Sequence, residues 1–273
     1  MFARFGDHDS QVANLIGVES ATGSNFADTI IGDTGRNTID GGVGDDFLDG
    51  GAGVANVLSF MSHDLALTHQ NEQFNICLGM NGNNGNVSVF GTVGGSFQLV
   101  ESDTIRNFND VMGSNHSENI SGNEQDNDLV GRGGDDVING FGGNDTLLGG
   151  SGQDRLIGSS GADDLLGGSE ADTFVFVTTS DSTPGAYDQI GDFEQGLDRI
   201  DVSHIDGSMQ QFGFQHLAFT TAQTPGFGQI ASHYDEQTGW TVIEARTNML
   251  SSTPNFHLEL FGHYNLTASD FIL

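Results

Sequence analysis

A nine-residue repeat runs without interruption from Gly113 to Val175. Seven copies follow one another in register, each opening with Gly, and each has an apolar residue at its eighth position. That apolar column consists of Ile120, Leu129, Ile138, Leu147, Leu156, Leu165 and Phe174. A period this regular predicts one small structural unit per copy, stacked on its neighbours, in place of one large globular core.

The chemistry of each copy predicts a loop followed by a short strand. Glycine permits positive φ angles and close backbone approach, so the first six residues can turn sharply and aim their carbonyls inward. The last three residues then run as a strand, and two copies close one turn of a flattened coil with the eighth residue inside. The predicted fold class is therefore all-β: a parallel β-roll built from nonapeptides.

Five copies carry Asp at the sixth position, and these carboxylates should lie in rows along the edges of the coil with no basic residue beside them. Stacked negative charges need a cation, and Ca²⁺ accepts about six to eight oxygens from carboxylates and loop carbonyls together. We expect at least four ions. The alternative is a metal-free glycine-rich coil or a disordered tract. The predicted metal-binding residues in this block are Gly131, Gly133, Asp136, Gly140, Gly142, Asp145, Gly149, Gly150, Gly152, Asp154, Gly158, Ser160, Asp163, Gly167, Ser169 and Asp172.

A shorter block, residues 23–58, contains four more copies with the apolar column Ile30, Ile39, Leu48 and Val57. Its sixth positions are Asp28, Asn37, Asp46 and Ala55, so it should hold fewer ions. The predicted metal-binding residues here are Asp28, Gly41, Gly42, Gly44 and Asp46. In the longer block, Glu118 and Asn127 replace Asp in the first two copies, which makes calcium doubtful there.

The copies closely match GGxGxDxUx, and the chain resembles the RTX calcium-binding repeat proteins. After Val175 the segments ADTFVF and YDQIGDFEQGLDRIDVS resemble the C-terminal domain that follows the β-roll in serralysin-type (peptidase M10) secreted metalloproteases. The matching positions are Asp188, Ile190, Asp192, Phe193, Gly196, Asp198, Ile200 and Asp201. Short strand signals beyond them, at 212–219, 228–234, 240–246 and 256–263, predict an antiparallel β cap over the open end of the coil.

The predicted organisation is a lead-in at 1–22, a first repeat block at 23–58, a β-rich insert at 59–112, a second block at 113–177 and a cap at 178–273. The insert lacks the nonapeptide but has strand-like alternation, so we expect it to stay in phase with the coil. The chain ends in Asp270-Phe271-Ile272-Leu273, an acidic residue followed by three apolar ones. This ending resembles the signature of type I export substrates, and it also suits a terminal strand docked in the cap.

The formal net charge is −31, with seven Arg and no Lys. Such a chain does not bind nucleic acid by neutralising phosphates. Without metal, self-repulsion and weak burial predict a disordered chain whose folding is coupled to calcium. The single cysteine, Cys77, excludes an internal disulfide, and no stretch is apolar enough to span a membrane. An N-terminal signal peptide is not visible, so secretion would follow the type I route that the resemblance implies.

Catalysis is not indicated. None of the nine histidines stands in HExxH, the motif that the serralysin protease domain requires, and no Lys is available for a Schiff base or a P-loop. The function expected is a non-catalytic calcium-binding module of a secreted, extracellular RTX protein whose partners are the type I secretion apparatus and an effector domain. The alternative is a module for acidic polysaccharides, similar to the R-modules of alginate epimerases, although Arg36, Arg132 and Arg155 are scattered.

Overall fold

The structure is a computed structural model that describes residues 2–4, 12–14, 19–63, 70–79, 84–93, 96–207 and 215–273. It divides into two compact units, residues 1–140 and 141–273, and β14 (Val137–Gly142) spans the boundary between them. Part of the predicted lead-in at 1–22 lies outside the described residues. The predicted domain boundaries at 22, 58, 112 and 177 stay predictions.

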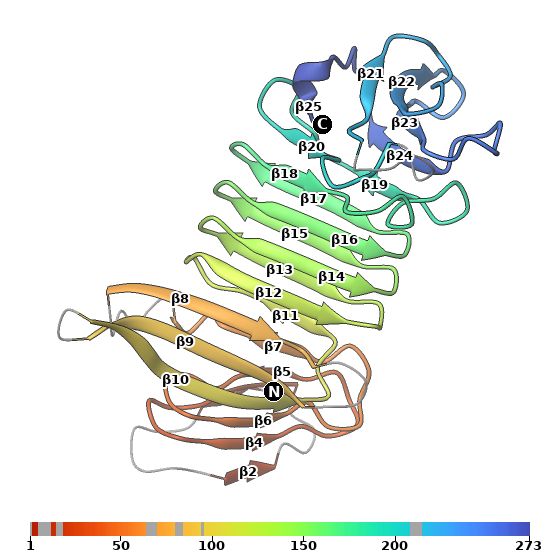
Figure 1. The fold of residues 1–273 in the computed structure, drawn as a ribbon. Helices are drawn as coiled ribbons and strands as arrows, with labels where there is room; N and C mark the ends of the chain where they lie inside the picture. Colours follow the sequence, from red (N-terminus) through yellow and green to blue (C-terminus); the bar gives the residue numbers. More distant parts are fainter. Residues whose placement is uncertain are drawn as a thin grey trace. The chain divides into compact units, whose positions relative to one another are not determined.

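The first unit consists of two sheets of mainly parallel short strands (Figure 1). One sheet has the order β1 (Phe2–Arg4), β3 (Ser20–Thr22), β5 (Thr38–Asp40), β7 (Val57–Ser59), β11 (Asp110–Met112) and β13 (Asp128–Gly133). The other begins with β2 (Val12–Asn14), β4 (Thr29–Ile31) and β6 (Phe47–Asp49), and ends with β12 (Glu118–Asn123). Successive strands alternate between the sheets from β1 to β7 and again from β11 to β13, as a coil requires.

The strand register shows that two nonapeptides form one turn. Ser20 pairs with Thr38 and Thr29 with Phe47, each across one turn of the first unit. In the second unit Thr146 pairs with Asp164 in the same way. A parallel neighbour two copies further along the chain is what the repeat chemistry predicts, so the predicted parallel β-roll is confirmed.

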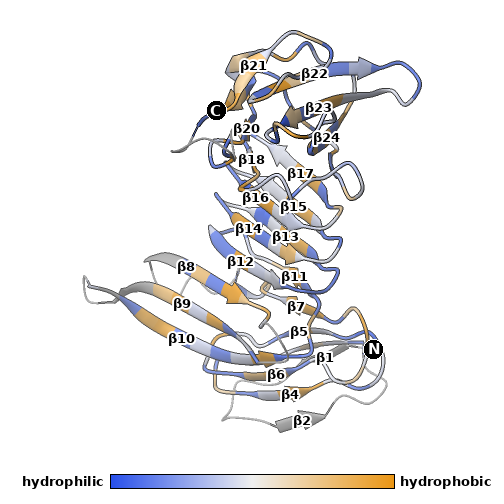
Figure 2. Ribbon diagram, turned by 45° about the vertical axis from the view of Figure 1, so that its right-hand side comes forward, coloured by the Kyte–Doolittle hydropathy of each residue, from blue (hydrophilic) through white to orange (hydrophobic). Residues whose placement is uncertain are grey.

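The insert adds three long strands to the second sheet: β8 (Gln70–Cys77), β9 (Gly85–Val93) and β10 (Ser96–Arg106). β10 pairs with β6 in parallel, β9 is antiparallel to both β10 and β8, and β8 pairs with β12 in parallel. The chain therefore leaves the coil for an antiparallel meander and returns to it. In Figure 2, hydrophobic and hydrophilic residues alternate along these strands, because successive side chains point to opposite faces.

The second unit also consists of a coil, and it ends in the cap. One sheet has the order β15 (Thr146–Ser151), β17 (Asp164–Ser169), β19 (Asp188–Ile190), β24 (Phe256–Phe261), β23 (Trp240–Arg246), β22 (Gln229–Asp235) and β21 (Ala218–Thr220). The other has β16 (Arg155–Ser160), β18 (Thr173–Val175), β20 (Arg199–Asp201) and β25 (Phe271–Ile272). The pairs β24–β23 and β23–β22 are antiparallel, as predicted for the cap. The described residues include no helix long and apolar enough to cross a bilayer.

The core of each coil is the apolar column read from the repeats. Every residue of the longer column, from Ile120 to Phe174, is at most 1% exposed. In the first block Ile30, Ile39 and Leu48 are equally buried, but the fourth position differs from the prediction. Leu58, not Val57, pairs with Ile39, because the turn before it contains one extra residue with Ala55 at a φ of 56°.

Candidate calcium-binding loops

A ladder of hydrogen bonds links the sixth residues of successive turns. The backbone N–H of Asp28 donates to Oδ1 of Asp46 at 2.7 Å, 18 residues further on. In the second unit the N–H of Asp145 donates to Oδ1 of Asp163, and that of Asp154 to Oδ1 of Asp172, both at 2.8 Å. One oxygen of each accepting carboxylate is therefore fixed by the coil, and the other is left to face its own loop.

The first glycine of each loop makes room for that second oxygen. A Cβ on Gly41 would lie 2.2 Å from Oδ2 of Asp46, and a Cβ on Gly149 would lie 2.2 Å from Oδ2 of Asp154. Gly158 and Gly167 stand in the same relation to Asp163 and Asp172. Glycine is needed here because any side chain would displace the carboxylate.

The second and fourth loop positions are left-handed. Gly42 and Gly150 at the second position have φ of 84° and 117°, and Gly44 and Gly152 at the fourth have φ of 136° and 124°. Some copies keep this conformation without glycine. A non-glycine residue is strained there, and the surrounding structure must hold it in place. These residues are Arg132, Phe141, Ser159 and Glu170.

Several loop carboxylates have a buried oxygen with no partner among the described residues, and such an oxygen is available to a cation. Oδ2 of Asp46, Asp172 and Asp188 is buried and has no hydrogen-bond partner within the part of the chain that the structure describes. Burial raises the pKa of Asp46 to about 9 and of Asp172 to about 7, against hydrogen bonds from the Asp28 and Asp154 N–H groups. A carboxylate so desolvated needs a proton or a cation. The donor set of carboxylates and carbonyls suits a hard divalent ion.

The side chains alone do not complete such a site. Among the described residues no three His, Cys, Asp or Glu side chains converge on a point that would hold a metal. Loop carbonyls must therefore supply the remaining oxygens. The loop positions predicted to contribute them are Gly131, Gly133, Gly140, Gly142, Gly150, Gly152, Ser160 and Ser169. Ser160 lies at the surface, where its hydroxyl donates to the carbonyl of Phe141.

The loops with Ser24 and Ser114 at the second position share one hydrogen-bond pattern. Oδ2 of Asp28 accepts hydrogen bonds from both the N–H and the hydroxyl of Ser24, at 2.7 and 2.9 Å. The carboxylate of Glu118 accepts from the N–H and the hydroxyl of Ser114. In these two loops the serine donors occupy carboxylate oxygens, whereas Oδ2 of Asp46 has no hydrogen-bond partner among the described residues. Asp28 and Asp46, both predicted as metal-binding residues, thus have different surroundings.

The sequence predicts Ala55 at the sixth position of its loop, and this prediction is wrong because the turn contains one extra residue. The N–H of Asn37 donates to Oδ1 of Asn56 at 2.9 Å, 19 residues later, so Asn56 and not Ala55 takes the sixth-position role. Both residues of this rung are amides, and the Asn37 amide group itself donates to the carbonyls of Gly35 and Gly50. This rung therefore has amides where other rungs have carboxylates.

The ladder also extends to three aspartates outside the nonapeptide period, which sequence reasoning did not place in the site. The N–H of Asp46 donates to Oδ1 of Asp103, and that of Asp163 to Oδ1 of Asp188. Asp198 accepts from the N–H of Asp172 in the same manner. A signal was available: as in the repeats, an apolar residue follows two positions after each Asp, and in these three it is Ile. Burial raises the pKa of Asp103 to about 8 and of Asp188 to about 9.

The arginines considered for an anionic polysaccharide are engaged within the protein. Arg36 lies 3.6 Å from a carboxylate oxygen of Asp110, and Arg155 lies 3.5 Å from one of Asp201. Arg132 donates to the carbonyl of Gly113. Acidic side chains face two of these three cations, which makes them poor anchors for a polyanion.

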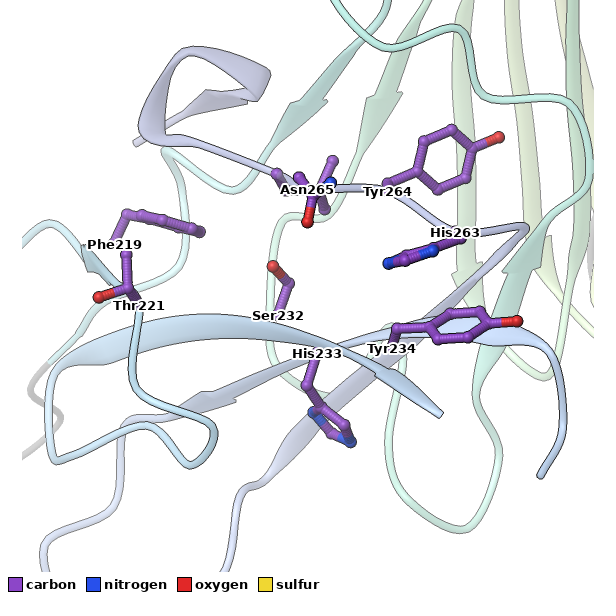
Figure 3. Close-up of a pocket in the computed structure, with 9 residues that line it drawn as sticks. Phe219, Thr221, Ser232, His233, Tyr234, His263, Tyr264 and Asn265 are labelled. Carbon is purple, nitrogen blue, oxygen red and sulfur yellow. The ribbon is translucent and has the colours of Figure 1, made fainter. Parts of the chain in front are cut away.

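The cap contains a shallow pocket of about 180 Å³, apart from the loops (Figure 3). The rings of Tyr234 and His263 stack at one side of it, with their centroids 4.2 Å apart. Phe219, Ser232 and Asn265 complete much of the lining.

A parallel coil of nonapeptide loops with buried carboxylates along its edges defines the class of calcium-repeat β-roll proteins. A family model described as RTX calcium-binding nonapeptide repeat (4 copies) matches residues 22–54, and one described as Peptidase M10 serralysin C terminal matches residues 107–273. Because the second match covers more than half of the chain, the chain belongs to the serralysin C-terminal family. Both families are typical of secreted proteins and are associated with type I secretion.

Solved structures of similar chains include two subunits of the Azotobacter vinelandii mannuronan C5-epimerase. The subunit AlgE6R3 is 28% identical, with 59% of this chain and 80% of that chain covered and a TM-score of 0.29. The subunit AlgE6R2 is 26% identical, with 56% of this chain and 91% of that chain covered and a TM-score of 0.34. The extracellular lipase LipA of Serratia marcescens is 14% identical at a TM-score of 0.35, with all of this chain and 40% of the lipase covered.

Proposed function

We propose that this chain is a non-catalytic calcium-binding β-roll module of a secreted RTX protein, which folds on extracellular calcium after type I secretion. The observation that carries the proposal is the ladder of buried sixth-position carboxylates. Asp154, Asp163 and Asp172 are each at most 2% exposed, and each belongs to a loop with glycine against its carboxylate.

Charge couples folding to the cation. The chain has a formal net charge of −31, and the coil draws its carboxylates together into buried rows. Burying a charge without a partner costs several kcal/mol per group, whereas the unfolded chain keeps each carboxylate in water. Bound calcium supplies the compensating charge in the folded state alone, so it stabilises that state by mass action. A cell with little free calcium inside would keep the chain unfolded until export.

The C-terminus of the fold suits this order of events. The 3-10 helix Ala268–Asp270 leads into β25, which pairs with β20 through Phe271 and Ile200. The buried Asp270 carboxylate accepts hydrogen bonds from the backbone N–H of Thr267 and the side chain of Gln195. An export apparatus that recognises these last residues would therefore meet them before folding, when they are accessible.

Two of the histidines, His63 and His257, have carboxylate partners that suit a structural role. His63 is buried with Nε2 against Glu101, and His257 lies between Glu244 and Glu259 on the cap strands. Neither stands in the HExxH sequence of a zinc protease. We propose that any effector activity belongs to a separate domain.

Calcium titration of chelator-treated protein tests the proposal. Far-UV circular dichroism follows the coil, and the fluorescence of Trp240 follows the cap, because Trp240 begins β23 and its ring packs against Phe261. We expect a cooperative gain of β signal together with a change in Trp240 emission, and no such change with magnesium. If the metal-free chain already shows the full β spectrum and calcium leaves it unchanged, the proposed function is wrong.

A further inference from the structure

The insert strand β10 lies against the loop Gly41–Asp46 as a following repeat would. The N–H of Gly44 donates to Oε2 of Glu101, and the N–H of Ser102 donates to Oδ1 of Asp45. The N–H of Asp46 donates to Oδ1 of Asp103 at 2.8 Å, 57 residues away in the sequence. The last contact repeats the ladder bond that links Asp28 to Asp46, so Asp103 has the place of a sixth-position carboxylate.

The strand register confirms this equivalence. Thr104 pairs with Phe47 and Ile105 with Leu48, so Ile105 takes the place of an eighth-position residue and is fully buried. The segment from Glu101 to Ile105 therefore acts as one turn of the coil, although no nonapeptide is present. Glu101 and Asp103 lie outside both ranges that the family models match, which are residues 22–54 and 107–273.

Three buried acidic side chains meet where β10 contacts the loop, and one histidine is their cationic partner. Asp46, Glu101 and Asp103 are each at most 5% exposed. Nε2 of His63 lies 3.2 Å from Oε1 of Glu101 and is the one cationic group in an ion pair with any of the three, within the described part of the chain. The nearby Arg106 is engaged with Asp49 at 2.6 Å.

An unsatisfied oxygen points to what is missing. Oδ2 of Asp46 is buried without a hydrogen-bond partner among the described residues, and it lies directly over Gly41. Both oxygens of Glu101 are used, one by His63 and the other by the Gly44 N–H, so Glu101 orients the loop. Oδ2 of Asp46 is left to face a ligand, and the carboxylate of Asp103 lies beside it, because its Oδ1 accepts from the Asp46 N–H. Carboxylate and carbonyl oxygens select a hard divalent cation over a transition metal.

We propose that the insert completes a calcium site in the first repeat block, with Asp46 and Asp103 as side-chain ligands, carbonyls of the Gly41–Asp46 loop as the other protein ligands, and Glu101 with His63 as positioning residues. The insert is thereby tied to the coil through a metal ion as well as through β10. This inference rests on the calcium binding proposed for the loops as a whole.

Counting bound ions in the full chain tests the site. By native mass spectrometry in calcium, Asp103→Asn should hold one calcium ion fewer than the wild type. The control Glu124→Gln removes an exposed charge from a loop that has Asn127 in place of a sixth-position carboxylate, and it should leave the count unchanged. An Asp103→Asn chain with the wild-type number of ions would overturn the inference.

A measurement on the unaltered protein guards against a variant that fails to fold. Crystals grown in calcium should give an anomalous difference peak between the Asp46 and Asp103 carboxylates, and its absence while other loops show peaks would also overturn the inference. If the wild type binds no calcium at all, it is the proposed function that fails.

Discussion

The backbone N–H of Asp172 donates a hydrogen bond of 3.0 Å to Oδ1 of Asp198, 26 residues further along the chain. Asp172 is the sixth residue of the last nonapeptide, whereas Asp198 belongs to the non-repetitive segment that leads to the cap. Oδ2 of Asp198 in turn accepts from the N–H of Glu194 at 2.8 Å. One carboxylate outside the period thus continues the ladder of the coil.

Two substitutions of Asp198 distinguish the effect of its hydrogen bond from the effect of its charge on stability. Asp198→Ala leaves the buried Asp172 N–H without its acceptor, and an unsatisfied buried donor costs about 1–3 kcal/mol. Asp198→Asn keeps an acceptor and should lose less. Urea denaturation in excess calcium, followed by Trp240 fluorescence, measures both. Equal losses for Ala and Asn would show that the charge and not the ladder bond matters.

The two faces of β17 offer a matched pair for the core. Leu165 is fully buried in the apolar column, while its neighbour Leu166 is half-buried on the opposite face of the strand. We expect Leu165→Ala to lower the free energy of unfolding by about 2–5 kcal/mol, because it leaves a cavity in a thin core. Leu166→Ala should cost clearly less in the same denaturation experiment. The reverse order would contradict the assignment of the inner face.

Loop glycines should affect calcium binding directly. A Cβ at Gly149 would lie 2.2 Å from Oδ2 of Asp154 and 2.6 Å from the carbonyl of Gly167, so Gly149→Ala must displace one of them. A forced overlap of this kind costs about 1–3 kcal/mol. The calcium midpoint in circular dichroism should therefore move to higher concentration. Gly185→Ala is the control, since no atom lies within 4 Å of its Cβ, and it should leave the midpoint in place.

His257 gives the cap a pH dependence of predictable sign. Burial alone would lower the pKa of His257, but hydrogen bonds and charges from Glu244 and Glu259 outweigh it and raise the pKa above 6.5. A raised folded-state pKa contributes stability that is fully present below the unfolded value and is lost as pH rises through the folded value. The free energy of unfolding should fall more steeply above pH 6.5 for the wild type than for His257→Gln, measured in excess calcium. Parallel curves would refute the coupling.

The terminal strand supplies a last matched pair. Phe271 is buried, with its ring centroid 5.4 Å from that of Phe219, whereas Ile272 is 40% exposed. Phe271→Ala should destabilise the cap by about 3–5 kcal/mol, since it removes a large buried side chain. Ile272→Ala should cost much less. Limited proteolysis of the C-terminus in calcium compares them, and equal protection of the two variants would contradict the docking of Phe271.

What the sequence by itself determined is the local unit and its repetition. Gly at the loop positions, Asp at the sixth and an apolar eighth residue specify a loop and a strand within nine residues. Repetition then requires parallel neighbours 18 residues apart. Leu147, Leu156 and Leu165 could be named as core residues for that reason, because their burial depends on the period and not on distant partners.

Only the tertiary structure decided where the period is broken. Asn56 replaces Ala55 in the ladder because one additional residue enters the turn, which no count of repeats reveals. Asp103 and Asp188 join the ladder because strand pairing brings them beside residues 57 and 25 positions away. Such long-range contacts depend on how β10 and β19 return to the coil. That return is set by side-chain packing and sheet register over the whole unit, whereas the nonapeptide specifies only its own loop and strand.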